Sequence, residues 1–201
     1  EAFGGGHQST ETPNADYVEI YNRGPNAVSL NGLSVQVATS TGAWQVIALP
    51  NFSLPARQYY LVQTEPDTTP GIDFVADLTS GTAFSQMTSA NGKCALVNGI
   101  TALSGSGCPI AGNVIDMLGF GTATGWEPCS GSKGPSGSIA SGNILSVTRK
   151  SGGCQDTNNN FNDFEAVAPS PTKSGVTQPL VREFTGTLSP VTGAWLIAVS
   201  P

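Results

Sequence analysis

The sequence predicts an all-β protein, a β-sandwich of immunoglobulin-like size with a strand extension at its C-terminal end. Short apolar runs, many of them alternating with polar residues, recur along the 201-residue chain, and no segment has a convincing helical period. The 25 glycines and 14 prolines place turn signals between these runs. Charged residues make up only 11% of the chain, against about 25% in a typical domain.

The clearest strand pattern lies at residues 16–22. Val18 and Ile20 point to one face, which we expect to enter the core, while Glu19 points to the opposite, solvent-facing side. An Asn-Gly dipeptide, a strong tight-turn signal, separates the second and third predicted strands. The predicted strands comprise residues 16–22, 27–30, 33–37, 44–49, 58–63, 92–98, 114–119, 144–150 and 164–168.

The charge distribution and the start of the chain indicate a compartment. The net charge is −6 and the eight basic residues are scattered, so we expect no nucleic acid partner. No apolar run approaches the roughly 18 residues that a membrane span needs. The chain starts at Glu1 and not at Met, which we interpret as removal of a signal peptide. We therefore expect a secreted protein that is extracellular or held at a cell surface.

The four cysteines predict disulfide bonds. They include no Cys-x-x-Cys pair, and His7 is the single histidine, so zinc binding is poorly supported. An even number of cysteines in a glycine-rich chain with few charges indicates two disulfides and an oxidising compartment. Four buried free thiols in a cytosolic protein are the alternative. Of the three pairings, we expect Cys94–Cys108 and Cys129–Cys154, each contributing roughly 3 kcal/mol by closing a loop.

Several motifs occur in an order that is typical of one family. They are Asp-Tyr-Val-Glu-Ile-Tyr-Asn-Arg-Gly at 16–24, Gln-Tyr-Tyr-Leu-Val-Gln at 58–63, Val-Ile-Asp-Met-Leu-Gly-Phe-Gly at 114–121 and Gly-Cys-Gln-Asp-Thr-Asn-Asn-Asn-Phe-Asn-Asp-Phe at 153–164. With these motifs the chain resembles the bacterial lamin tail domain family. The resemblance implies an immunoglobulin-like β-sandwich that acts as a binding or structural module, often attached to secreted enzymes or surface proteins, without catalytic residues.

Three features depart from the family pattern. Leu33 stands where a tryptophan is usual, the first strand is truncated because the chain starts at Glu1, and residues 176–201 lie beyond the family's end. We therefore expect two parts, a lamin-tail-like β-sandwich over residues 1–175 and a C-terminal extension over residues 176–201.

The C-terminal extension contains one apolar run that is long enough for a buried strand. Such a strand needs a covering partner in water. It either folds back onto its own sandwich, beside the truncated first strand, or adds to the sheet of another copy, which would build a filament. A linker to a further domain is the third alternative. The run consists of Ala194, Trp195, Leu196, Ile197, Ala198 and Val199.

The Asn-rich segment has two interpretations. Its oxygen-bearing side chains alternate like the first ligands of an EF-hand loop, which makes calcium a candidate ligand. However, Phe161 stands where such a loop needs glycine. In the alternative, Asp and Asn side chains cap backbone donors in successive turns, Phe161 and Phe164 enter the core, and Cys154 ties the segment to Cys129. The candidate calcium ligands are Asp156, Asn158, Asn160 and Asp163.

Catalysis is not expected. A Ser-His-Asp arrangement is improbable because His7 is the only histidine and lies in a Gly-rich segment. Glu19 and Asp116 are the best candidates for a glycosidase-type carboxylate pair. However, Glu19 also fits a solvent-facing position, and we expect Asp116 to hydrogen-bond a turn or to pair with Arg149.

The sequence contains candidate residues for glycan binding and one candidate site for glycosylation. Flat aromatic side chains could stack on sugar rings, although we expect Trp44 to pack in the core. Asn51-Phe52-Ser53 is an N-glycosylation sequon. The aromatic candidates are Trp44, Tyr59, Tyr60 and Trp126.

The sequence therefore predicts a non-enzymatic extracellular structural protein, a self-assembling surface filament subunit that exchanges its terminal strand between copies. The alternative is a carbohydrate- or cell-wall-binding module of a secreted hydrolase or adhesin. Another copy of the chain is the expected partner, with a glycan as the second candidate. Calcium apart, we expect no cofactor.

Overall fold

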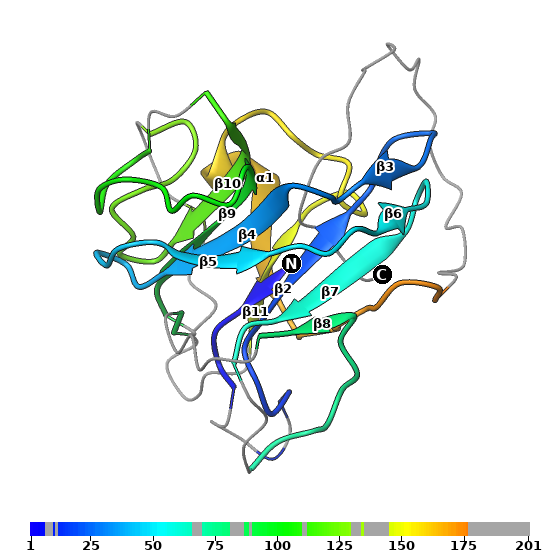
Figure 1. Cartoon of the computed structure of the whole chain (residues 1–201). Coiled ribbons are helices and arrows are strands. Elements are labelled where there is room, and N and C mark those ends of the chain that lie inside the picture. The colour runs from blue at the N-terminus through cyan, green and yellow to red at the C-terminus, as the bar shows by residue number, and fades with distance from the viewer. Residues whose placement is uncertain are drawn as a thin grey trace.

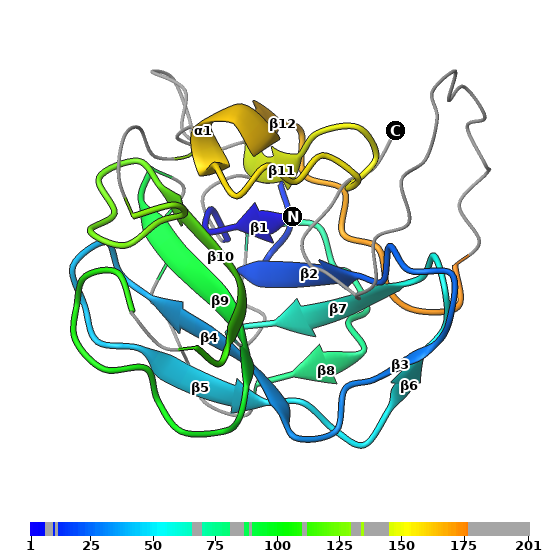
Figure 2. The same cartoon turned by 90° about the horizontal axis from the view of Figure 1, so that it is seen from above.

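The computed structural model describes residues 1–6, 10, 12–65, 70–80, 87–88, 90–109, 112–129, 134 and 145–176. Within these ranges the chain forms three β-sheets and one short helix, so the all-β prediction is confirmed. Figures 1 and 2 show the two larger sheets as two layers of a sandwich. His7 and the apolar run at 194–199 lie outside the described residues, and so does the proposed fold of the extension after Val176.

The first layer is a six-stranded sheet in which neighbouring strands are antiparallel, except for the parallel last pair. Its third strand, from the start of the chain, pairs with a strand from near residue 147, so the sheet joins residues far apart in the sequence. In sheet order it contains β12 (Phe164–Val167), β11 (Ser146–Arg149), β1 (Ala2–Phe3), β2 (Tyr17–Tyr21), β7 (Tyr59–Gln63) and β8 (Leu78–Thr79).

The second layer is a four-stranded antiparallel sheet. In sheet order it contains β10 (Val114–Phe120), β9 (Gly92–Asn98), β4 (Leu33–Ala38) and β5 (Gln45–Ala48). A small two-stranded sheet of β3 (Val28–Ser29) and β6 (Ser53–Leu54) lies at one end of the sandwich (Figure 1). The helix α1 (Asn160–Asp163) connects β11 to β12.

The main core lies between the two layers and is made of alternating side chains. Val18 and Ile20 of β2 meet Val35 and Val37 of β4 in one cluster of buried residues. The predicted alternation in residues 16–22 is therefore confirmed for the core side. Apolar side chains at every second position are what a strand needs when it buries one face.

The opposite face of β2 is not exposed to solvent, so this part of the prediction is wrong. Glu19 is fully buried, and Tyr17 packs with Phe3 and Leu61 in a second apolar cluster that Phe74 covers. The chain segment after β12 also lies on this face and contacts Glu19. A period of two residues separates the two faces of a strand but does not say what covers each of them.

Three short strands were not predicted. β1, β6 and β8 have two residues each, and a two-residue strand carries no detectable period. β1 is nevertheless an interior strand, because Ala2 pairs with Val147 of β11 and with Val18 of β2. The start of the chain therefore connects the two halves of the six-stranded sheet. In the part of the chain that the structure describes, no helix has the length and apolar character needed to span a bilayer.

Candidate functional site

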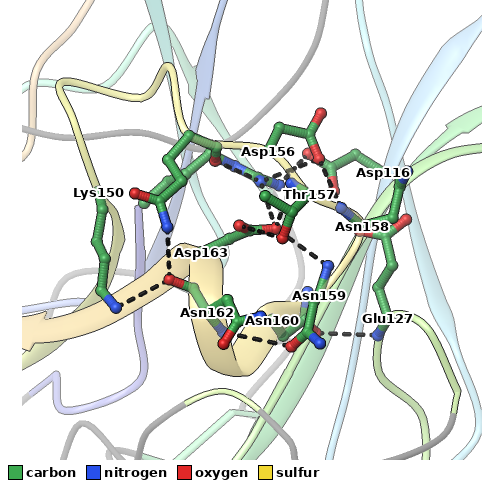
Figure 3. A network of polar contacts seen from close by, with 12 residues as sticks. Asp116, Glu127, Lys150, Asp156, Thr157, Asn158, Asn159, Asn160, Asn162 and Asp163 are labelled. Atoms are coloured by element: carbon green, nitrogen blue, oxygen red, sulfur yellow. Dashed lines mark hydrogen bonds and ion pairs between the residues drawn. The ribbon is translucent and has the colours of Figure 1, made fainter.

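The Asn-rich segment lies between β11 and β12 and builds a polar network against β10 (Figure 3). It turns into α1 at Asn159, whose side chain accepts hydrogen bonds from the backbone N–H groups of Phe161 and Asn162 at 3.1 and 3.3 Å. An Asn at this capping position satisfies donors that a helix start leaves unpaired. The backbone becomes extended again at Phe164, where β12 begins.

Asn160 fastens this segment to the outer edge of β10. Its Oδ1 accepts a hydrogen bond from the N–H of Gly119 at 2.8 Å, and its Nδ2 donates to the carbonyl of Met117 at 2.9 Å. These two backbone groups are two residues apart on the same strand edge, so the buried amide takes the place of a neighbouring strand's peptide group. Gly134 also donates its N–H to the carbonyl of Gly119 at 2.9 Å. The edge of β10 is thereby protected.

The same asparagine also binds the loop that contains Glu127. The N–H of Glu127 donates to Asn160 Oδ1 at 3.1 Å, and the N–H of Asn160 donates to the carbonyl of Glu127 at 2.8 Å (Figure 3). One buried side chain therefore holds three backbone segments together, which are β10, the Glu127 loop and α1.

Arg149 is a fully buried cation at the centre of the network. Its Nη2 donates to Asp116 Oδ2 at 2.6 Å, which confirms the pairing with Arg149 as the correct one of the two alternatives for Asp116 and links β11 in one layer to β10 in the other. Its Nη1 donates to the carbonyl of Gln155 at 3.1 Å and lies 3.4 Å from Asp156 Oδ1. The guanidinium carbon lies 4.5 Å from the ring centroid of Phe164, at cation–π distance.

The side chains of three candidate calcium ligands, Asp156, Asn160 and Asp163, bind protein groups in this structure. Asp163 accepts from the N–H and hydroxyl of Thr157, both at 2.8 Å, and from the N–H of Asn159 at 3.0 Å. Asp156 pairs with Arg23 at 3.0 Å and accepts from the N–H of Asn158 at 3.3 Å.

This geometry is the one that the capping interpretation describes. Among the described residues, no group of three or more His, Cys, Asp or Glu side chains could hold a metal ion. Calcium binding by Asp156, Asn158, Asn160 and Asp163 stays a prediction.

The two phenylalanines of the segment have different positions. Phe164 is 2% exposed and packs in the main core, as predicted, but Phe161 is 59% exposed, so the prediction for Phe161 is wrong. The cause is the single turn of α1. Asn160 and Asp163 are three residues apart, share its inward face and are both fully buried, which leaves Phe161 on the outward face.

The disulfide prediction is also wrong. Cys108 pairs with Cys129, while Cys94 is a buried free thiol and Cys154 is an exposed free thiol. Cys94 points into the main core between the layers, whereas Cys108 packs against a cluster on the other face of the four-stranded sheet. Strand β9 therefore separates Cys94 from Cys108, although they are neighbours among the cysteines. Cys154 does not tie the Asn-rich segment to Cys129; Asn160 and Arg149 hold the segment.

The sugar-binding candidates do not form an exposed aromatic platform. Trp44 is 4% exposed and Lys93 Nζ lies 4.9 Å from its ring centroid, which confirms its expected core role. Tyr59 and Tyr60 are buried, and Trp126 is half-buried. Asn51 is exposed in the bend before β6, an accessible position for a sequon.

An excess of carboxylates surrounds the Arg149 site. The pKa of Glu127 is raised to about 8, mainly by burial and also by the nearby Asp116 and Asp156, while Arg149 opposes the rise. Burial also raises the pKa of Asp116, again opposed by Arg149. Asp116 Oδ1 and Glu127 Oε2 are both buried without a hydrogen-bond donor. A proton shared between these two carboxyl groups would satisfy both oxygens.

A second polar site was not predicted from the sequence. Glu1, Glu19 and Asp77, which we name the carboxylate row, accept hydrogen bonds from residues 168–176, which we name the strap. In the strap, hydroxyl side chains occupy every second position at Ser170, Thr172 and Ser174. This period of two residues was the available signal for an extended segment that lies on a sheet.

Comparison with known families gives one match. The family model of the lamin tail domain matches residues 3–122, more than half of the chain. The chain belongs to the lamin tail domain family. This family has an immunoglobulin-like structural fold, in agreement with the sandwich described above. The matched range of this lamin tail domain ends before β11, although β11 pairs with β1 in the same sheet. Comparisons with curated proteins and with solved structures give no match.

Replacing Asn160 with alanine should destabilise the protein strongly. The substitution leaves the buried groups of Met117, Gly119 and Glu127 without this partner, and we expect a loss of about 2–4 kcal/mol in the free energy of unfolding. Asn162→Ala is the control, because this exposed side chain neighbours the site and its substitution should change stability by about 0.5 kcal/mol or less. Urea denaturation measures both variants, and equal losses would contradict the proposed role of Asn160.

Thiol titration should find one reactive cysteine in the native protein. Cys154 is exposed, Cys94 is buried and the other two cysteines form a disulfide. A thiol reagent should therefore label one site per native chain and two sites per chain after denaturation without reductant. Cys154→Ser should remove the native reaction. Two reactive thiols in the native state, or none after denaturation, would disagree with this arrangement.

Glu127 should make stability fall as the pH rises. An unfolded glutamate has a pKa of about 4.3, and the pKa of Glu127 is raised to about 8 in the fold, mainly by burial. The folded state therefore holds an extra proton between these values, so its contribution is fully present below about pH 4.3 and is lost as the pH rises through about 8.

Glu127→Gln should remove this dependence. The variant should match the unmutated protein in melting temperature near pH 4 and exceed it near pH 9. Glu165→Gln, at an exposed position of β12, is the control and should follow the unmutated protein at both pH values. Parallel curves for all three proteins would show that Glu127 ionises normally in the fold.

Proposed function

We propose that this lamin tail domain is a non-enzymatic extracellular structural protein whose copies assemble into a surface filament by strand addition. The donated strand is the apolar run at residues 194–199. The observation that carries the proposal is the difference between the two edges of the four-stranded sheet. Asn160 and Gly134 occupy the outer edge of β10, whereas β5 has a strand on one side only within the described ranges.

The sequence of β5 supports its role as the acceptor. Gln-Val-Ile-Ala contains no charge and no proline, the residues that proteins commonly use to protect an edge strand. The N–H of Leu49 donates to the carbonyl of Leu33 in β4 at 2.9 Å. Because such bonds alternate along an antiparallel pair, the N–H groups of Val46 and Ala48 point away from β4, toward an added strand.

Other observations support the extracellular and non-enzymatic parts of the proposal. The Cys108–Cys129 disulfide fits an oxidising compartment, and the exposed Asn51 fits N-glycosylation. Both carboxylates considered for catalysis bind protein groups, since Asp116 pairs with Arg149 and Glu19 accepts from Thr172. We assign no cofactor to the assembly.

Electron microscopy of the purified chain tests the proposal. The unmutated chain should form filaments, and a chain ending at Gly175 should remain as single particles. Val46→Pro should also prevent assembly, because proline removes an N–H that points outward from β5 without breaking a bond to β4. Val46→Thr is the matched control, since it keeps both the N–H and the branched side chain, and should still assemble.

Two results would refute the filament. One is the persistence of filaments after truncation at Gly175, and the other is an unmutated chain that forms no filaments at any concentration. In the second case a glycan array would examine the alternative, a carbohydrate- or cell-wall-binding module.

A further inference from the structure

The strap crosses the outer face of the six-stranded sheet. It is drawn in orange in Figures 1 and 2, where it leaves β12 and ends near β7 and β8. Ser170, Thr172 and Ser174 donate hydrogen bonds to the sheet side, as alternate residues of an extended segment do. The strap pairs with no strand, so side chains and not a backbone ladder hold it within the described structure.

The contacts between strap and carboxylate row repeat the same chemistry. Ser170 donates its N–H to Glu1 Oε1 and its hydroxyl to Glu1 Oε2, both at 3.0 Å. Ser174 donates its N–H to Asp77 Oδ2 at 2.7 Å and its hydroxyl to Asp77 Oδ1 at 2.6 Å. Each serine thus uses two donors on one carboxylate, an arrangement that is both charge-assisted and directional.

Between these serines, Thr172 donates its N–H to Glu19 Oε2 at 2.7 Å. Glu19 is fully buried, and burial raises its pKa well above the usual range; the terminal amino group and the Thr172 hydrogen bonds oppose this rise, and Glu1 adds to it. Removing the Thr172 N–H would therefore leave a buried carboxyl group without this donor, at a substantial desolvation cost.

The sheet positions the carboxylate row independently of the strap. Glu19 belongs to β2, and Glu1 precedes β1 directly. Asp77 precedes β8 and also accepts from the N–H of Leu61 in β7 at 2.9 Å. A row that is built on three parts of one sheet keeps its spacing when the strap leaves.

The strap, in turn, can leave without opening the sandwich. None of its residues belongs to the buried core clusters, whose last member in the chain is Phe164. Pro169 and Pro171 favour an extended backbone at Ala168 and Ser170, so the strap keeps its shape when it is detached. Its release costs a set of polar contacts and the cover of one sheet face, which makes it a unit of local opening.

We propose that the carboxylate row is a docking site for the strap of a second copy, so that two copies exchange residues 168–176. The partner is another copy because its strap has the same alternating serine and threonine donors that the row binds here. Exchange of an identical segment replaces every contact that it breaks. This inference rests on the proposed self-assembly and adds the segment that would link the copies ahead of the apolar run at 194–199.

A complementation experiment with full-length chains tests the exchange. The row variant is Glu19→Met with Asp77→Asn, which removes one acceptor and turns an amide donor toward Ser174. The strap variant is Thr172→Pro with Ser174→Pro, which removes the matching N–H donors. Both chains also carry Ile197→Asp, so that the apolar run does not contribute to assembly.

Each variant alone should be a monomer, because every copy lacks either the row or the strap. A 1:1 mixture should form a dimer of twice the monomer mass in native mass spectrometry, since one intact row then meets one intact strap. A chain that carries both sets of substitutions is the control and should pair with neither. Absence of the dimer, with both variants folded by near-ultraviolet circular dichroism, overturns the proposal.

If either variant fails to fold, isotope-filtered nuclear Overhauser measurements on the unmutated protein test whether the strap is exchanged between copies. A 1:1 mixture of labelled and unlabelled chains should show contacts between Thr172 of one copy and Glu19 of the other, and contacts within one copy alone overturn the exchange. The two proposals fail separately. If filaments form but the mixed dimer does not, strap exchange is wrong and the filament proposal stands. If the mixed dimer forms but filaments do not, the filament proposal is wrong and strap exchange stands.

Discussion

The buried ion pair between Arg149 and Asp116 is the contact on which the polar part of this structure depends. It joins β11 of one layer to β10 of the other at 2.6 Å. Because a buried cation is costly to desolvate unless its neighbours satisfy it, Arg149 requires further acceptors close by. Asp156 and the carbonyl of Gln155 supply them, and Phe164 covers the guanidinium. The acidic side chains of the Asn-rich segment therefore surround this cation, while Asn159 caps α1 and Asn160 binds β10.

The same need for buried polar partners explains Asn160 and the carboxylate row. Backbone N–H and carbonyl groups away from water need hydrogen-bond partners. At the edge of β10 one asparagine amide supplies them, and on the outer face of the six-stranded sheet three carboxylates supply them to the strap. In both places a side chain takes the role that a neighbouring strand would otherwise have. The sandwich thus closes one edge and covers one face with polar contacts.

The errors of the sequence prediction have a common physical origin, which is that a local pattern does not show what covers each face of a strand or helix. Cys94 and Cys108 are consecutive cysteines in the sequence. However, side chains alternate between the two faces of β9, so Cys94 lies in the main core, while Cys108 lies on the other side of the sheet. Glu19 alternates with core residues as expected, yet the strap buries it from the other side. Phe161 was placed in the core by its apolar character, but Asn160 and Asp163 take the inward face of a single helical turn.

By itself the sequence determined the all-β class, the longer strands, the core alternation of residues 16–22 and the lamin tail family, and it gave the pairing of Asp116 with Arg149 as one of two alternatives. These predictions follow from the two-residue period of strands, from residue chemistry and from local motifs, all of which involve residues that are close together in the sequence. Only the tertiary structure decided which cysteines meet, which edge Asn160 occupies and what covers Glu19. Each of these depends on contacts between segments far apart in the sequence, such as Gly119 with Asn160 or Glu19 with Thr172. A local sequence pattern does not show which distant backbone groups need a hydrogen-bond partner.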